Sequence, residues 1–138
     1  MVKYLSINDL EKVRLRFFPA LWLKELKDEL NSDPRYAKIA KNWEGYLFFY
    51  IEPEDHLWER LAFYLDLWHG RCRKVEYNPQ ADSHPNPAFT LIASYNNITA
   101  ILSRKLNLVT ATLTSKLKTQ GSTGFMMWNV PPCSILCV

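Results

Sequence analysis

The stretch LAFYLDLWHGRCRKVEY, residues 61–77, decides the fold. Every second residue from 61 to 67 is leucine or phenylalanine. This is the period of a β-strand with one apolar face. His69–Gly70 follows, and glycine supplies the positive φ that a tight hairpin turn needs. Residues 71–77 then return as the second strand of a β-hairpin.

Three more strands are expected around this hairpin. Residues 46–51 form an aromatic and β-branched run after Gly45, and a turn follows at 53–55. Residues 88–93 come after a loop, 78–87, that contains three prolines. Because these strands follow one another along the chain, the sequence predicts a four-strand meander. A short fifth strand is expected at Lys116–Gln120.

Helices are expected both before and after this run of strands along the chain. Apolar residues recur at helical spacing from Ile7 to Phe17, with Ser6 and Asp9 as a capping box. A second apolar stripe follows Pro19. Its members are Trp22, Leu23, Leu26 and Leu30.

Later helices carry recognisable start signals. Asp33–Pro34 is typical of an N-cap and first helical residue, and Ser94 is a second N-cap. A short helix is expected at Leu106–Leu113. Ser122 or Thr123 begins a last helix, which Pro131–Pro132 ends or kinks.

The expected fold is therefore α+β, with about five strands in a largely antiparallel sheet and helices on one face. The 138 residues suit one domain. Residues 1–42 are its N-terminal helices, 43–130 its core and 131–138 a tail. No signal peptide or membrane span is evident, so the cytoplasm is the expected location. No cofactor is expected.

Charge narrows the choice of partner. The net charge of +3 is too small to indicate nucleic acid binding. All acidic residues lie between Asp9 and Asp82. The basic residues beyond them, Arg104, Lys105, Lys116 and Lys118, favour an anionic ligand or transient contact with an anionic membrane, unless the imbalance is incidental.

Three segments together resemble the sterol carrier protein type 2 family, in its prokaryotic branch. Residues 42–53 resemble its first strand, residues 64–72 its hairpin, and residues 106–121 its stretch of helix, short strand and glycine. The resemblance runs from about Asn31 to Val130. Many relatives have glycine where this chain has Ser115, and a glycine–lysine pair where it has Arg104–Lys105.

The resemblance implies a non-catalytic carrier with an apolar tunnel between sheet and helices. Such a tunnel holds one lipid-like molecule, such as a fatty acid, an acyl-CoA or a sterol, and the last helix often gates it. The implied ligand-binding residues are Phe49, Ile51, Phe63, Leu65, Leu67, Phe89, Leu91, Ile98, Ile101, Leu102, Leu113, Met126, Met127 and Val130.

Two other functions remain open. The same sheet with a filled core suits a protein-interaction module, including a homodimer. Asp66 and His69 are candidates for an enzyme's acid–base pair, although a strand face and a turn place them there without any function.

Three weaker motifs have simple structural explanations. Arg71, Arg73 and Lys74 with Tyr77 resemble a basic–aromatic patch that is too small for nucleic acid. Three cysteines without a CxxC pair make a poor disulfide framework, and Cys133 with Cys137 does not complete a zinc site. Asn97 begins a glycosylation sequon that a cytoplasmic chain would not use.

Overall fold

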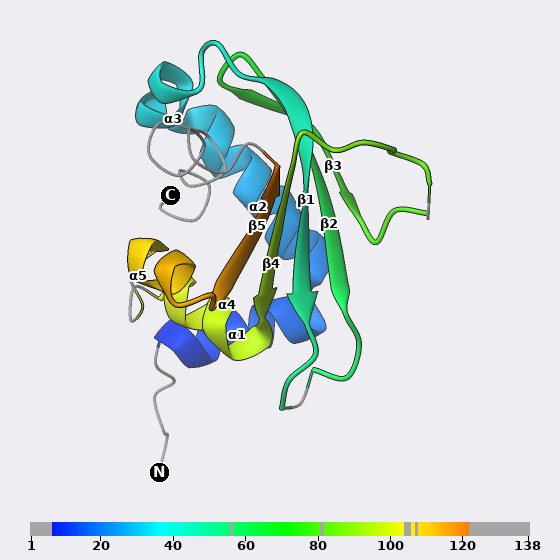
Figure 1. The fold of residues 1–138 in the computed structure, drawn as a ribbon, viewed down its shortest axis with the longest axis vertical. Coiled ribbons are helices and arrows are strands. Elements are labelled where there is room, and N and C mark those ends of the chain that lie inside the picture. Colours follow the sequence, from blue (N-terminus) through cyan, green and yellow to red (C-terminus); the bar gives the residue numbers. More distant parts are fainter. Residues whose placement is uncertain (1–6, 56, 81, 104–105, 107, 122–138) are drawn as a thin grey trace.

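A computed structural model describes residues 7–55, 57–80, 82–103, 106 and 108–121. Among the described residues, three helices are followed by four strands, two helices and a last strand (Figure 1). Their order is α1 (Ile7–Phe17), α2 (Pro19–Ser32), α3 (Pro34–Ile39), β1 (Glu44–Glu52), β2 (Leu61–Trp68), β3 (Arg71–Tyr77), β4 (Phe89–Ser94), α4 (Tyr95–Leu102), α5 (Leu108–Leu113) and β5 (Leu117–Gly121).

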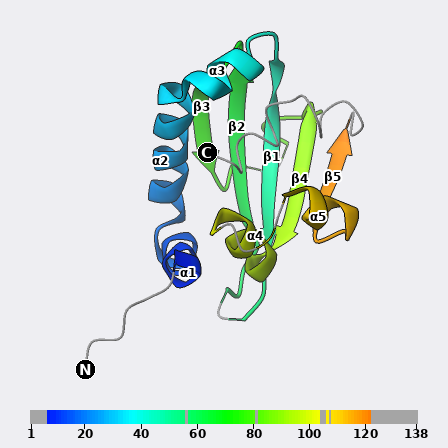
Figure 2. The same cartoon turned by 90° about the vertical axis from the view of Figure 1, so that its left-hand side faces the viewer.

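The strands form a five-stranded sheet in the order β3-β2-β1-β4-β5. Neighbouring strands are antiparallel except for β1 and β4, which are parallel. The described helices lie on one side of this sheet (Figures 1 and 2). The predicted α+β fold, with a largely antiparallel sheet and helices on one face, is confirmed.

The predicted four-strand meander is wrong, because β4 does not pair with β3. It lies beside β1, with Phe89 opposite Leu47. The connection at 78–88 therefore has to cross β2 and β1, and it crosses the face opposite the helices (Figure 1). Its His84 ring stacks on Tyr64, with ring centroids 3.8 Å apart. The Ala88 N–H donates to the Tyr46 carbonyl at 3.0 Å, which starts the parallel pairing.

The hairpin of β2 and β3 is confirmed, with the predicted turn. His69 and Gly70 have φ values of 50° and 79°. Glycine is required at the second position for packing as well. A Cβ atom on Gly70 would lie 2.6 Å from the carbonyl oxygen of Ala37 in α3. The turn and α3 are therefore in direct contact.

The predicted caps of α3 and α4 are also confirmed. Asp33 accepts hydrogen bonds from the backbone N–H groups of Arg35 and Tyr36, at 2.8 and 3.4 Å. Ser94 accepts from the N–H of Asn97 at 3.3 Å. The last predicted helix, beyond Ser122, lies outside the described residues.

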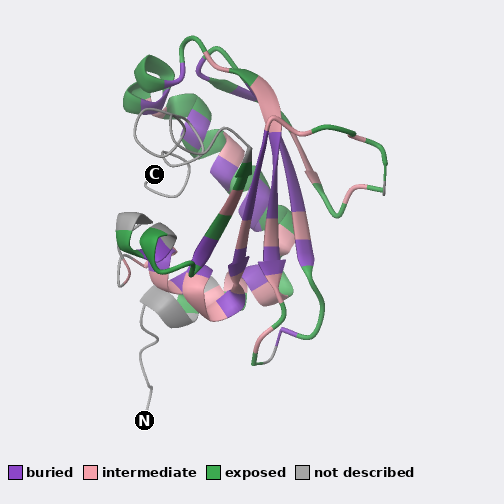
Figure 3. Ribbon diagram, viewed as in Figure 1, coloured by how far each residue is buried: buried purple, intermediate pink, exposed green. Residues whose placement is uncertain are grey.

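The two N-terminal stripes behave differently. All four apolar residues of the α2 stripe are buried. In α1, Leu10, Val13 and Phe17 of the predicted apolar stripe are exposed, and Phe17 is 57% exposed. Leu15 is fully buried and connects α1 to the core instead. Figure 3 shows the buried positions gathered where α2, α4 and the strands face one another.

Candidate ligand-binding site

One face of the sheet is continuously apolar, and we call it the inner face. It consists of the strand residues whose side chains point toward the helices. Phe49 of β1 lies between Phe63 of β2 and Leu91 of β4 in the sheet register. The neighbouring rows are Leu65–Leu47–Phe89 and Leu61–Ile51–Ala93.

Among the described helices, α2 and α4 contribute side chains that cover this face. The Trp22 ring of α2 lies 5.3 Å from the Phe63 ring, measured between centroids. Ile98 and Ile101 of α4 belong to the same buried cluster. Alternation along the strands and helical spacing in α2 and α4 thus bring apolar side chains together from segments far apart in the sequence.

Most of the predicted ligand-binding residues lie together. Leu102 packs partly buried against the cluster, whereas Leu113 is 73% exposed on α5. Met126, Met127 and Val130 lie outside the described residues. The fully clustered ones are Phe49, Ile51, Phe63, Leu65, Leu67, Phe89, Leu91, Ile98 and Ile101.

The cluster contains few polar groups. Thr90 and Thr99 are the buried polar residues in the described part of the chain. The Thr99 hydroxyl donates to the Tyr95 carbonyl at 3.0 Å, within its own helix. Among the described residues, no group of histidine, cysteine and carboxylate side chains could hold a metal ion. The described part of the inner face therefore offers a largely apolar surface.

Tyr36, which the sequence placed in a short helix, carries a buried hydroxyl. It is 1% exposed on α3, and its hydroxyl has no hydrogen-bond partner among the described residues. Burial raises its pKa above that of an ordinary tyrosine. An unsatisfied hydroxyl depends on tertiary packing, so no sequence pattern could have shown it.

The candidate acid–base pair does not converge. Arg73 donates to both carboxylate oxygens of Asp66, at 3.2 and 3.1 Å. His69 Nε2 lies 2.8 Å from the Glu44 carboxylate. Each side chain thus has a different surface partner, and neither belongs to the buried cluster.

The basic–aromatic patch lies on the surface, whereas the sequon is partly buried. Lys74 pairs with Glu76 at 2.9 Å, which partly neutralises the basic–aromatic patch on β3. Asn97 of the sequon lies in α4, and its Nδ2 donates to the Lys116 carbonyl at 3.4 Å. Thr99, the third sequon residue, is fully buried.

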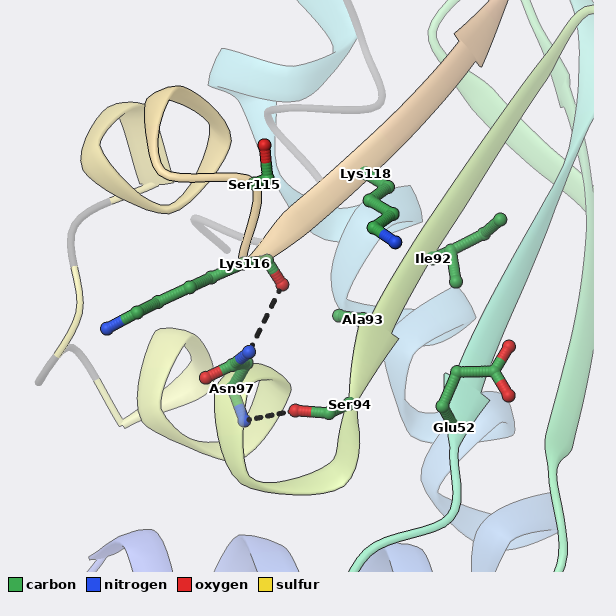
Figure 4. Close-up of a pocket in the computed structure, with 8 residues that line it drawn as sticks. All are labelled: Glu52, Ile92, Ala93, Ser94, Asn97, Ser115, Lys116 and Lys118. Carbon is green, nitrogen blue, oxygen red and sulfur yellow. Dashed lines mark hydrogen bonds between the residues drawn. The ribbon is translucent and has the colours of Figure 1, made fainter.

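A small depression of about 210 Å³ opens where β5 and α4 begin (Figure 4). Lys118 and Glu52 contribute side chains of opposite charge to its lining. Glu52 is also paired with Arg60 at 3.0 Å. The depression is too small, and its lining too polar, to enclose a long hydrocarbon.

Comparison with known proteins agrees with this geometry. The sequence matches the SCP-2 sterol transfer family over residues 23–131. The chain belongs to this family. No curated protein matches the chain. In the described part of this family member, no helix is long and apolar enough to cross a membrane.

Several solved structures share the fold. A crystal structure of sterol carrier protein 2 is 22% identical, with a TM-score of 0.70, over 85% of this chain and 92% of that one. A possible sterol carrier protein from Thermus thermophilus is 23% identical, with a TM-score of 0.68, over 89% and 84% of the two chains. Palmitated SCP2L2 from Aedes aegypti is 17% identical, with a TM-score of 0.51, over 72% and 79%.

Proposed function

We propose that the protein binds one lipid-like molecule between the inner face and the helices, and carries or presents it without chemistry. The observation that supports this most is the inner face itself. Residues from three strands and α4 form one apolar cluster that holds few polar groups. Membership of a sterol transfer family supports the same function.

The physical driving force is hydrocarbon burial. Each buried methylene contributes about 0.8 kcal/mol, so fifteen of them contribute roughly 12 kcal/mol before other costs. Ordering the ligand and its surroundings removes a large part of this. Enough remains for an apolar site to compete with a membrane for a long chain. Such a protein lowers the barrier to lipid transfer with no catalytic group.

The ligand class that we propose is a fatty acid, an acyl-CoA or a sterol-like lipid. A fatty acid has support from the palmitated SCP2L2 structure, and sterols from the family's name. The implied binding residues include those of the inner face together with Met126, Met127 and Val130. Leu113 joins the site only if α5 turns inward, because it is largely exposed here.

An anionic membrane is the proposed transient partner. Lys116 and Lys118 are exposed on the chain entering and forming β5. Replacing both with glutamine should slow lipid transfer from anionic vesicles, and added salt should slow it in the natural protein because exposed charges are screened. Equal rates from neutral vesicles would show that these lysines do not contact the membrane.

A protein-interaction module is the second candidate, because the cluster residues contact one another closely. Phe49, Phe63 and Leu65 are all fully buried. This candidate predicts a dimer or a partner complex that binds no lipid.

Titration with a fluorescent long-chain fatty acid separates the two functions. We expect saturable binding at about one site per chain, and native mass spectrometry of fresh protein should find one lipid mass. No saturable signal with fatty acid, acyl-CoA or sterol, together with a bare dimer, would overturn lipid binding.

A further inference from the structure

Tyr36 carries a buried hydroxyl that the described residues leave unsatisfied. Such groups are costly, and native proteins keep few of them without a reason. Tyr95 provides a comparison within the same cluster. It is 3% exposed, but its hydroxyl donates to the Lys12 carbonyl. Burial of a tyrosine in this core therefore does not by itself leave its hydroxyl without a partner.

Tyr36 lies at one end of the inner face. Its helix, α3, crosses the sheet where β2 ends and β3 begins (Figure 2). Leu67 and Cys72 pair there, and both belong to the same cluster as Tyr36. The other end of the inner face lies near α4 (Figure 1). From Leu61 to Leu67 the strand advances roughly 20 Å, enough for a long hydrocarbon.

We propose that the Tyr36 hydroxyl donates a hydrogen bond to an uncharged oxygen at the end of the bound lipid, while the hydrocarbon runs along the inner face toward α4. An alcohol, a ketone or an ester carbonyl supplies such an oxygen. This inference rests on the proposed function, and it adds an orientation and a chemical class of ligand end.

The surroundings of Tyr36 explain why this oxygen is uncharged. Burial raises the pKa of the nearby Cys72 thiol to about 12. The Lys27 ammonium group acts in the opposite direction, but desolvation outweighs it. A region that keeps both a thiol and a phenol neutral also disfavours a carboxylate. A fatty acid therefore places its carboxylate elsewhere, toward solvent.

The test compares Tyr36→Phe with Tyr95→Phe, using hexadecyl alcohol, hexadecane and palmitate as competitors of a fluorescent probe. Tyr36→Phe should weaken binding of the alcohol about tenfold, as expected for one lost buried hydrogen bond. The affinities for hexadecane and palmitate should not change. The melting temperature of Tyr36→Phe should not fall. Tyr95→Phe should melt lower, because it loses a made hydrogen bond, and keep the natural preference for the alcohol.

The outcomes separate this inference from the proposed function. If Tyr36→Phe weakens the alcohol and hexadecane equally, Tyr36 acts by packing and the inference is wrong. If the alcohol binds Tyr36→Phe as tightly as the natural protein, the hydroxyl does not contact the ligand. If the natural protein binds none of the three lipids, the proposed function itself fails.

Discussion

The side-chain amide of Asn31 pairs with the main chain of Cys72 as a neighbouring strand would. Asn31 Nδ2 donates to the Cys72 carbonyl at 2.9 Å, and the Cys72 N–H donates to Asn31 Oδ1 at 2.8 Å. Cys72 lies on β3, which is the edge of the sheet. An open edge invites pairing with another chain. Asn31, near the end of α2, supplies hydrogen-bond partners for the Cys72 main chain on this edge, at the point where the helix packs against it.

Asn31→Ala should destabilise the protein by about 1–3 kcal/mol, because it leaves two partly buried main-chain groups of Cys72 without partners. Urea unfolding monitored by circular dichroism measures this. Ser32→Ala is the matched control, since its exposed hydroxyl only bonds back to Asp28 and Glu29 within α2. It should change stability by less than about 0.5 kcal/mol. Equal effects of the two variants would contradict the role of Asn31.

Ser115→Gly should stabilise the protein. Ser115 has a φ of 62°, a left-handed conformation that costs a residue with a side chain about 1 kcal/mol relative to glycine. Part of the gain is offset by the greater freedom of glycine in the unfolded chain. Thr114→Gly, one residue earlier, is expected to destabilise instead. A lower melting temperature for Ser115→Gly would show that the serine side chain contributes more than its backbone strain costs.

The local elements could be predicted because their signals lie within a few residues. Hydrophobic alternation indicated the strand Leu61–Trp68, and the turn after it indicated the returning strand Arg71–Tyr77. Asp33 and Ser94 marked two helix starts. The parallel pairing of β1 and β4 could not be predicted by this route. It depends on the connection from β3 to β4, which crosses β2 and β1. Chain order alone favours pairing of consecutive strands, here β3 with β4. One signal was available, since Phe89–Ala93 carries an apolar residue on each face, with Thr90 as its one polar residue, and central strands are often apolar on both faces.

The candidate site could be predicted only as a set of inward-facing positions. Strand alternation was enough to place Phe49, Phe63 and Leu91 on the inward sides of their strands. Their shared row depends on the β1–β4 pairing, which the sequence did not show. The sequence pattern could not show that the Leu113 side chain is exposed, because a six-residue helix has too few turns to define a buried side. Nor could it reveal the unsatisfied hydroxyl of Tyr36, which depends on what α3 packs against.

Asp66→Asn and His69→Gln should leave lipid binding nearly unchanged. Their partners are Arg73 and Glu44, on the surface and outside the apolar cluster. Fatty-acid titration of the two folded variants checks this. A loss of affinity of more than about tenfold, or 1.4 kcal/mol, would place the altered residue in the site.

Acid should loosen α3 before the rest of the fold. The pKa of Asp33 is lowered from 3.8, chiefly because the Arg35 N–H donates to its carboxylate. Because the pKa of Asp33 is lower in the folded protein, the cap stabilises the fold at pH values above the pKa that Asp33 has in the unfolded chain. This stabilisation is lost as the pH falls through the pKa that Asp33 has in the folded protein. Hydrogen exchange at Ala37 and its neighbours should therefore lose protection below about pH 4.

Asp33→Asn separates this titration from other effects of acid. Asparagine keeps an oxygen that accepts the same N–H groups but does not titrate in this range. The early loosening of α3 should disappear in this variant, while the rest of the protein responds to acid as before. If α3 loses protection at the same pH in both proteins, another carboxylate is responsible.

Shortening the Ile98 side chain to alanine separates a lipid carrier from an interaction module with a filled core. Ile98 is fully buried on α4, against the inner face, and Leu30 is equally buried on α2 but outside the predicted ligand set. Without lipid, alanine at either position should cost about 2–5 kcal/mol, because each leaves a cavity. In a carrier, a bound hydrocarbon fills the space left at Ile98. Added lipid should then recover more stability in Ile98→Ala than in Leu30→Ala.

Paired melts of delipidated protein, with and without a long-chain fatty acid, measure this difference. The comparison depends on removing any co-purified lipid first, since bound ligand would disguise the loss in the starting state. An equal lipid-induced shift in both variants and in the natural protein would mean that the ligand does not contact α4. No shift in any of them would favour the interaction module, because a site that binds no lipid gains nothing from a cavity beside it.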